Sequence, residues 1–175
     1  MAINVVLIVV LMLVAVGATG LCSFNPGAPE QGPVQEVDAK TFLELESRAV
    51  DFPVRYPEMP DGWTTNSARR SMIGGQPAPV VGWVTPNTGY IQLTQTGEAA
   101  DTARAEVDDK ARTLARTVPV DGTEAQVYSS DDKDVRDLWV VDASDERLLL
   151  TGAGDDSEFE ELIAAALAAT PLAPR

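Results

Sequence analysis

Histidine is absent from this 175-residue chain, cysteine occurs once, and basic residues are scarce. Without histidine the chain lacks the commonest general base and the commonest transition-metal ligand. The single cysteine, Cys22, excludes both an intramolecular disulfide and a zinc site built from several thiolates. The 13 Lys and Arg face 27 Asp and Glu, and the resulting net charge of −14 opposes binding to nucleic-acid phosphates. We therefore expect no enzyme, no cofactor, no metal and no nucleic-acid partner.

The first segment, residues 1–22, is almost entirely apolar and long enough to cross a membrane. Between Ala2 and Leu21, only Asn4 and Thr19 have distinctly polar side chains. About 20 apolar residues in a helix span a hydrocarbon core of roughly 30 Å. This pattern favours an uncleaved transmembrane anchor. A cleaved signal peptide and a lipoprotein signal acylated at Cys22 are the alternatives. All three place the rest of the chain outside the cytoplasm, and the anchor makes it a single-pass cell-membrane protein.

No basic residue precedes the apolar run, although anchors and signal peptides normally have one there. We therefore expect translation to start upstream, with a short basic cytoplasmic leader. A lipoprotein signal needs a small residue before its cysteine, whereas this chain has Leu21. Cys22 is best interpreted as a residue at the membrane edge, with acylation or an intermolecular disulfide as the alternative.

Residues 23–37 have the composition of a linker, and residues 38–175 that of one folded domain. Three prolines and two glycines lie within residues 24–33, which prevents a regular helix or a central strand. We interpret this stretch as a semi-extended stalk that lifts an extracytoplasmic domain off the bilayer.

The domain alternates between strand and helix patterns. Helices are predicted at 38–50, with Asp38 as N-cap, at 98–115, and at the C-terminus, where Ser157 and Glu160 predict a capping box. Strand patterns cover 64–71, 80–85, 90–96, 126–128, 137–141 and 147–151. Successive strands with few helices between them predict an α+β fold, an antiparallel sheet covered by two or three helices.

The negative charge is concentrated in the C-terminal part of the domain. Residues 121–161 contain 14 acidic and 3 basic side chains, a local net charge of −11. Two clusters stand out within this stretch: Asp131, Asp132 and Asp134, and then Asp155 with Asp156. Their spacing matches no calcium-binding loop, so we interpret them as solvated carboxylates. They are also the candidate acidic surface for a partner with a complementary basic surface.

Short motifs along nearly the whole chain occur in the same order as in a known family. They are Phe24-Asn25-Pro26-Gly27, Phe52-Pro53-Val54, Pro60-Asp61-Gly62-Trp63, Gly82-Trp83-Val84-Thr85-Pro86, Tyr90-Ile91-Gln92-Leu93 and Leu148-Leu149-Leu150-Thr151-Gly152. In these motifs the chain resembles a family of actinobacterial envelope proteins catalogued as domain-of-unknown-function family 4245. The resemblance implies a single-pass membrane protein with an extracytoplasmic domain, and it brings no reaction, cofactor or catalytic residue.

A tether, a stalk, one domain and no reactive constellation predict a non-catalytic accessory or interaction subunit of the cell envelope. Its expected partner is a larger membrane protein complex, such as a respiratory or transport assembly. The alternative is a binding module for a lipid or other apolar ligand, with a pocket lined by Trp63, Trp83 or Trp139. Aromatic residues on strands are more often core residues than pocket lining.

Overall fold

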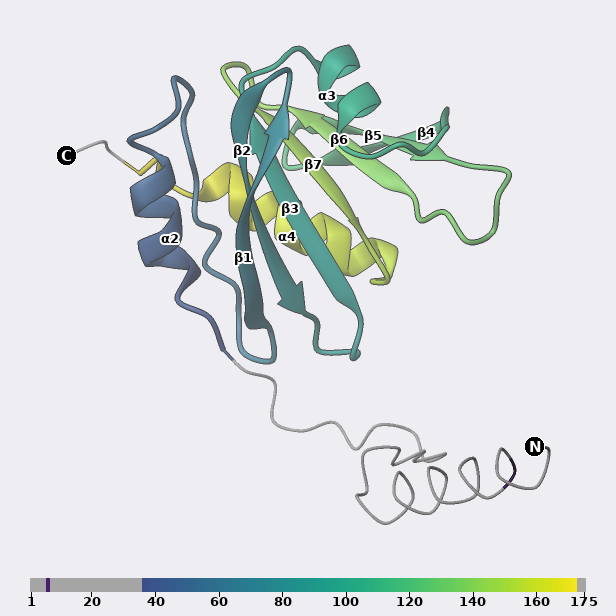
Figure 1. The fold of residues 1–175 in the computed structure, drawn as a ribbon, viewed down its shortest axis with the longest axis horizontal. Helices are drawn as coiled ribbons and strands as arrows, with labels where there is room; N and C mark the ends of the chain where they lie inside the picture. Colours follow the sequence, from purple (N-terminus) through teal and green to yellow (C-terminus); the bar gives the residue numbers. More distant parts are fainter. Residues whose placement is uncertain (1–5, 7–35, 173–175) are drawn as a thin grey trace. The chain divides into compact units, whose positions relative to one another are not determined.

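The computed structural model describes Val6 and residues 36–172. Residues 36–172 form one antiparallel sheet with three helices (Figure 1). The predicted anchor, apart from Val6, and the predicted linker as far as residue 35 lie outside the described residues. Within the part that is described, no helix is both long enough and apolar enough to span a membrane.

The sheet has seven strands, and every neighbouring pair is antiparallel. The elements in chain order are α2 (Ala39–Glu46), β1 (Thr64–Ile73), β2 (Gln76–Val84), β3 (Tyr90–Thr96), α3 (Ala100–Glu106), β4 (Thr113–Val120), β5 (Thr123–Ser129), β6 (Leu138–Asp142), β7 (Arg147–Gly152) and α4 (Asp156–Ala168). The strands lie side by side in the order β1-β2-β3-β7-β6-β5-β4. This arrangement confirms the predicted α+β class, and it makes β1 and β4 the two edges.

Both faces of the sheet are packed, but unequally. Successive side chains of a strand point to opposite faces. One set, which includes Trp83, Leu93, Trp139 and Leu150, forms the larger core with α2 and α4. The other set, including Val140 and Leu149, forms a smaller core with Ala103 of α3. In Figure 1, α4 crosses the sheet on one face and α2 lies beside β1.

The predicted helix at 98–115 is wrong over its second half. α3 ends at Glu106, and Thr113 already belongs to β4. Among the residues of α3, only Ala103 is buried, so the alanine-rich stripe provides little apolar surface for a longer helix. The following residues, 113–120, pair with β5 through a two-residue turn at Asp121 and Gly122, whose φ angles are 47° and 81°. Sheet pairing overrides the helical composition here.

The cap predicted for α4 is also wrong in register. Asp155, not Ser157, is the N-cap, and Glu158, not Glu160, completes the capping box. Asp155 Oδ1 accepts the Glu158 N–H at 3.0 Å, and Glu158 Oε2 accepts the Asp155 N–H at 3.0 Å. The N-cap predicted for α2 is confirmed, because Asp38 Oδ1 accepts the Thr41 N–H at 3.0 Å.

The pairing between β2 and β3 does not include the first residues of β2. Its register ends at the pair Val80↔Thr94, one residue short of Pro79. Proline has no N–H to donate to a neighbouring strand. The two strands therefore end their pairing at this point, near the turn between β1 and β2.

Candidate functional site

A buried polar network joins four separate segments of the domain. The guanidinium of Arg55 is paired with the carboxylate of Glu146, whose side chain is fully buried. The backbone N–H and C=O of Arg55 bond to the side-chain amide of Gln95, each at 2.8 Å. Arg55 Nη1 also donates to the carbonyls of Leu167 and Ala169, at 3.3 and 2.7 Å. Arg55 thereby satisfies carbonyls at the C-terminal end of α4 that the helix itself leaves without partners.

The Glu146 carboxylate is held in an unfavourable environment for a charge. Burial raises the pKa of Glu146 above its ordinary value of 4.5, and the Arg55 guanidinium opposes that rise. Its second oxygen, Oε2, has no hydrogen-bond partner among the described residues. The extended segment after α4 lies alongside Arg55, where Leu172 donates its N–H to the Val54 carbonyl at 2.8 Å. This network fastens internal segments of the domain together.

A groove of about 560 Å³ lies next to this network, between α2 and the end of α4. Its lining includes Lys40, Tyr56 and Glu58, together with residues from the end of α4 and the segment after it: Ala165, Ala168, Ala169, Thr170, Pro171 and Leu172. Lys40 Nζ lies 3.9 Å from Glu58 Oε1 and 6.0 Å from the centre of the Tyr56 ring. The charged groups that line the groove are therefore exposed and lie next to one another.

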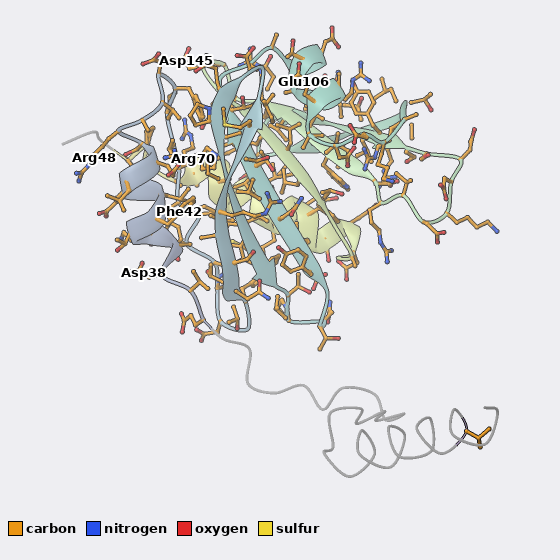
Figure 2. The ribbon with its side chains drawn as sticks, viewed as in Figure 1. Asp38, Phe42, Arg48, Arg70, Glu106 and Asp145 are labelled. Atoms are coloured by element: carbon orange, nitrogen blue, oxygen red, sulfur yellow. The ribbon has the colours of Figure 1, made fainter. Side chains whose placement is uncertain are left out.

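A smaller cavity of about 260 Å³ lies where β2 and β3 end their pairing. Phe52 and Pro77 contribute apolar surface, and the carboxylates of Asp51, Glu98 and Asp145 belong to its lining. Asp145 is at the turn between β6 and β7 (Figure 2). No group of three or more Cys, Asp or Glu within residues 36–172 is arranged to hold a metal ion.

The first predicted acidic cluster lies on the exposed loop between β5 and β6. Asp131, Asp132 and Asp134 are all exposed, and none forms an ion pair with another described residue. The Asp134 N–H donates to Asp132 Oδ1 at 3.0 Å, which closes a local turn. Arg112 Nε donates to the Arg136 carbonyl at 2.8 Å, which fixes the end of the loop. The three carboxylates are therefore displayed on an ordered loop.

The second predicted cluster is divided between two different roles. Asp155 is the N-cap of α4, and its hydrogen bonds with the Ser157 hydroxyl and the Glu158 N–H hold its pKa below its usual 3.8. Asp156 is exposed and lies 2.8 Å from Arg116 Nη2. Asp155 thus has a structural role, whereas Asp156 belongs to a surface ion pair.

Arg116 of β4 connects the two acidic segments, a role that the sequence analysis did not identify. Its guanidinium contacts Asp156 at 2.8 Å and Asp137, at the end of the β5–β6 loop, at 3.7 Å. The same guanidinium lies 5.4 Å from the centre of the Trp139 ring, which stacks on Phe159 at 5.2 Å. The end of the acidic loop and the start of α4 therefore meet at one arginine. Because no strand was predicted at 113–120, no sequence pattern pointed to this role.

The three tryptophans lie away from the groove and the smaller cavity. Trp83 and Trp139 are 1% exposed within the larger core. The Trp63 indole N–H donates to Glu161 at 3.0 Å. None of the three contributes to the groove or to the cavity described above.

These features define an α+β domain with one antiparallel sheet, a closed core and an exposed acidic loop. The chain matches, over residues 1–166, the family described as "Protein of unknown function (DUF4245)", and it belongs to that family. No curated protein and no solved structure matches it significantly.

Proposed function

We propose that this protein is a non-catalytic interaction subunit, anchored in the cell membrane by residues 1–22 as a single-pass protein. Its domain lies outside the cytoplasm and joins a larger membrane protein complex, such as a respiratory or transport assembly. The apolar segment and the proline-rich linker support the tether. The acidic loop between β5 and β6 supports the choice of contact surface.

The observation that carries the proposal is the ordered acidic loop. Asp131, Asp132 and Asp134 are exposed without ion-pair partners among the described residues, and Arg116 joins the end of their loop to α4. Other carboxylates are neutralised by arginines, as in the bidentate pairs Asp108–Arg112 and Glu46–Arg70. Asp51, Asp61 and Glu124 are also exposed without ion pairs, but each stands alone. The loop differs from them in placing three unpaired carboxylates within four residues.

An ordered loop of like charges suits recognition of a basic surface. The carboxylates stay solvated in the free protein, so their charge attracts a basic partner and speeds association. Ordering the loop in advance reduces the conformational entropy lost on binding. Because exposed charges are screened beyond roughly 8 Å at physiological ionic strength, such binding must weaken as salt is added.

Isolation of the tagged full-length protein from native membranes in mild detergent tests the proposal. We expect one membrane protein complex to co-purify in a fixed ratio and to be released when salt is raised from about 0.1 to 1 M, where the Debye length falls from about 10 to 3 Å. Recovery of the protein with no co-purifying membrane protein at low salt would overturn the proposal.

A further inference from the structure

The two edges of the sheet are not equivalent, and the difference points to a second interaction surface. An edge strand presents backbone N–H and C=O groups that another strand can pair with, unless prolines, bulges or charges prevent it. The edges here are β1 and β4. Which of their backbone groups point outward follows from the turns that join them to their neighbours.

In β1, three consecutive outward positions have intact backbone donors. β1 and β2 are joined by the two-residue turn Gly74-Gly75, so Ile73 and Gln76 form a hydrogen-bonded pair. Bonded and non-bonded pairs alternate along an antiparallel ladder. The N–H and C=O groups of Ala68, Arg70 and Met72 therefore point away from β2. Arg70 and Met72 stand opposite Pro79 and Pro77 of β2. These two prolines have no backbone N–H, so they need no acceptor on a neighbouring strand.

In β4, the corresponding edge is blocked. The turn at Asp121-Gly122 makes Val120, Val118 and Arg116 the bonded positions, so Pro119 and Thr117 point outward. Pro119 has no N–H, and a bulge interrupts the register between Leu114 and Arg116. Both features protect an edge against pairing. β1 also has a bulge, between Thr65 and Ser67, and the Thr65 carbonyl accepts the Val37 N–H at 2.9 Å, but the register is regular from Ser67 to Ile73. Among the described residues, the part of β1 from Ala68 to Met72 is thus the edge that remains open to a further strand.

Apolar side chains accompany the open backbone of β1. Met72 is 54% exposed, and Leu45 of α2 is 57% exposed. α2 is held against β1 by the bidentate pair of Arg70 with Glu46, at 2.7 and 2.8 Å. Exposed apolar residues beside unpaired backbone groups are typical of an interface between protein chains.

A contact through this edge keeps the acidic loops of two copies away from each other. β1 contains Arg69 and Arg70 and no acidic residue, whereas the acidic loop lies between β5 and β6, toward the opposite edge. Two copies that meet at β1 therefore keep their acidic loops on the outer halves of the joined sheet. The charge of Arg70 is matched by Glu46 in each copy, which reduces repulsion at the contact.

We propose that β1 pairs antiparallel with β1 of a second copy, so that one continuous sheet runs through a two-fold dimer. A two-fold axis at Arg70 places Met72 opposite Ala68 of the second copy, a large side chain against a small one on the same face. Such an interface is isologous and closes the only edge left open among the described residues. This dimer goes beyond the proposed function, because it uses a different surface and needs no other protein.

The test measures the mass and the amide exchange of the full-length protein in detergent. Light scattering during size exclusion, corrected for bound detergent, should give a protein mass that rises from monomer to dimer with concentration. Hydrogen exchange at Ala68, Arg70 and Met72 should slow over the same concentration range. A monomer at every concentration, or a dimer whose exchange at these residues stays fast, would overturn the proposal.

Two pairs of variants locate the contact. Met72→Pro removes one outward N–H of β1, and Thr117→Pro removes one outward N–H of β4. Since the dimer would lose one hydrogen bond on each side of its axis, Met72→Pro should weaken dimerisation by about 10- to 100-fold, and Thr117→Pro should leave it unchanged. Met72→Lys and its control Leu114→Lys repeat the comparison with both backbone amides intact. Equal dimerisation in Met72→Lys and Leu114→Lys would contradict pairing through β1.

Discussion

At the scale of single residues, the domain depends on a few charges that are removed from water and matched. Glu146 is fully buried, and its main partner, Arg55, is 91 positions away in the chain. A buried charge without its partner is much more costly than the intact pair. The pair therefore marks a position where a single substitution should be severe.

Replacing Arg55 by Met should lower the free energy of unfolding by about 3–5 kcal/mol at neutral pH, because the Glu146 charge is left buried alone. The loss should depend on pH. Burial already raises the pKa of Glu146, and removal of Arg55 raises it further. The variant should therefore be most stable below pH 4.5 and lose stability as the pH rises through the pKa of the folded state.

Urea unfolding of Arg55→Met and wild type between pH 4.5 and 8 measures this effect. The double variant Arg55→Met with Glu146→Gln is the matched control, and it should lose the pH dependence. A single variant as stable as the wild type at pH 8 would contradict the role assigned to this ion pair.

A second residue-scale prediction concerns the space at Gly82. A Cβ there would overlap the Tyr90 hydroxyl, which itself lies 3.0 Å from the Ser67 hydroxyl. Gly82→Ala should destabilise the domain by about 1–3 kcal/mol through overpacking. In the double variant Gly82→Ala with Tyr90→Ala, the loss should be smaller than the sum of the single losses. Additive losses, measured by urea unfolding, would show that Tyr90 does not occupy this space.

At the scale of elements, α4 is fastened at both ends. Its first turn has the capping box of Asp155 and Glu158, and Asn87 of the β2–β3 turn contacts both carboxylates. Its last carbonyls accept hydrogen bonds from Arg55. The helix is therefore fixed over the larger core by contacts that a helix of this composition does not provide by itself.

Asp155→Ala should destabilise the domain, because the first turn of α4 loses its cap. The effect has a defined dependence on pH. The pKa of Asp155 is lowered by its hydrogen bonds, so its stabilising contribution is present above pH 3.8 and disappears as the pH falls through the folded-state pKa. The difference in unfolding free energy between wild type and variant should therefore shrink in acid. The conservative control is Asp155→Asn, which should retain more stability at pH 7. Unfolding curves that differ equally at pH 7 and pH 3 would contradict this account.

The sequence predicted elements well where the pattern is local and poorly where pairing decides. The strand at 90–96 and the Asp38 cap are confirmed, because alternation and capping are properties of neighbouring residues. β4 was missed, since the residues before it have a helical composition and its strand character comes from pairing with β5. Ser157 was chosen over Asp155 as N-cap because both residues have suitable side chains.

At the scale of the whole molecule, charge is distributed by topology. The acidic loop belongs to the half of the sheet formed by β4 to β7, and the basic strand β1 forms the opposite edge. The α+β class was predictable from the alternation of elements, but the order of the strands was not, because β7 pairs with β3 across more than fifty residues of sequence. The contact between Arg116 and Asp156 could not be predicted either, because the two residues are 40 positions apart in the sequence and meet only in the folded domain.

The central claim, that the acidic loop docks a membrane partner, is tested most directly by one comparison of co-purification. The triple variant Asp131→Asn, Asp132→Asn, Asp134→Asn removes the loop charges. Its matched control neutralises three exposed carboxylates elsewhere, as Asp51→Asn, Asp61→Asn, Glu124→Gln. The amount of partner recovered per tagged protein at 0.1 M salt is measured for both. We predict a loss of at least about tenfold for the loop variant, equivalent to about 1.4 kcal/mol, and little change for the control. Equal recovery from the two variants would contradict the claim.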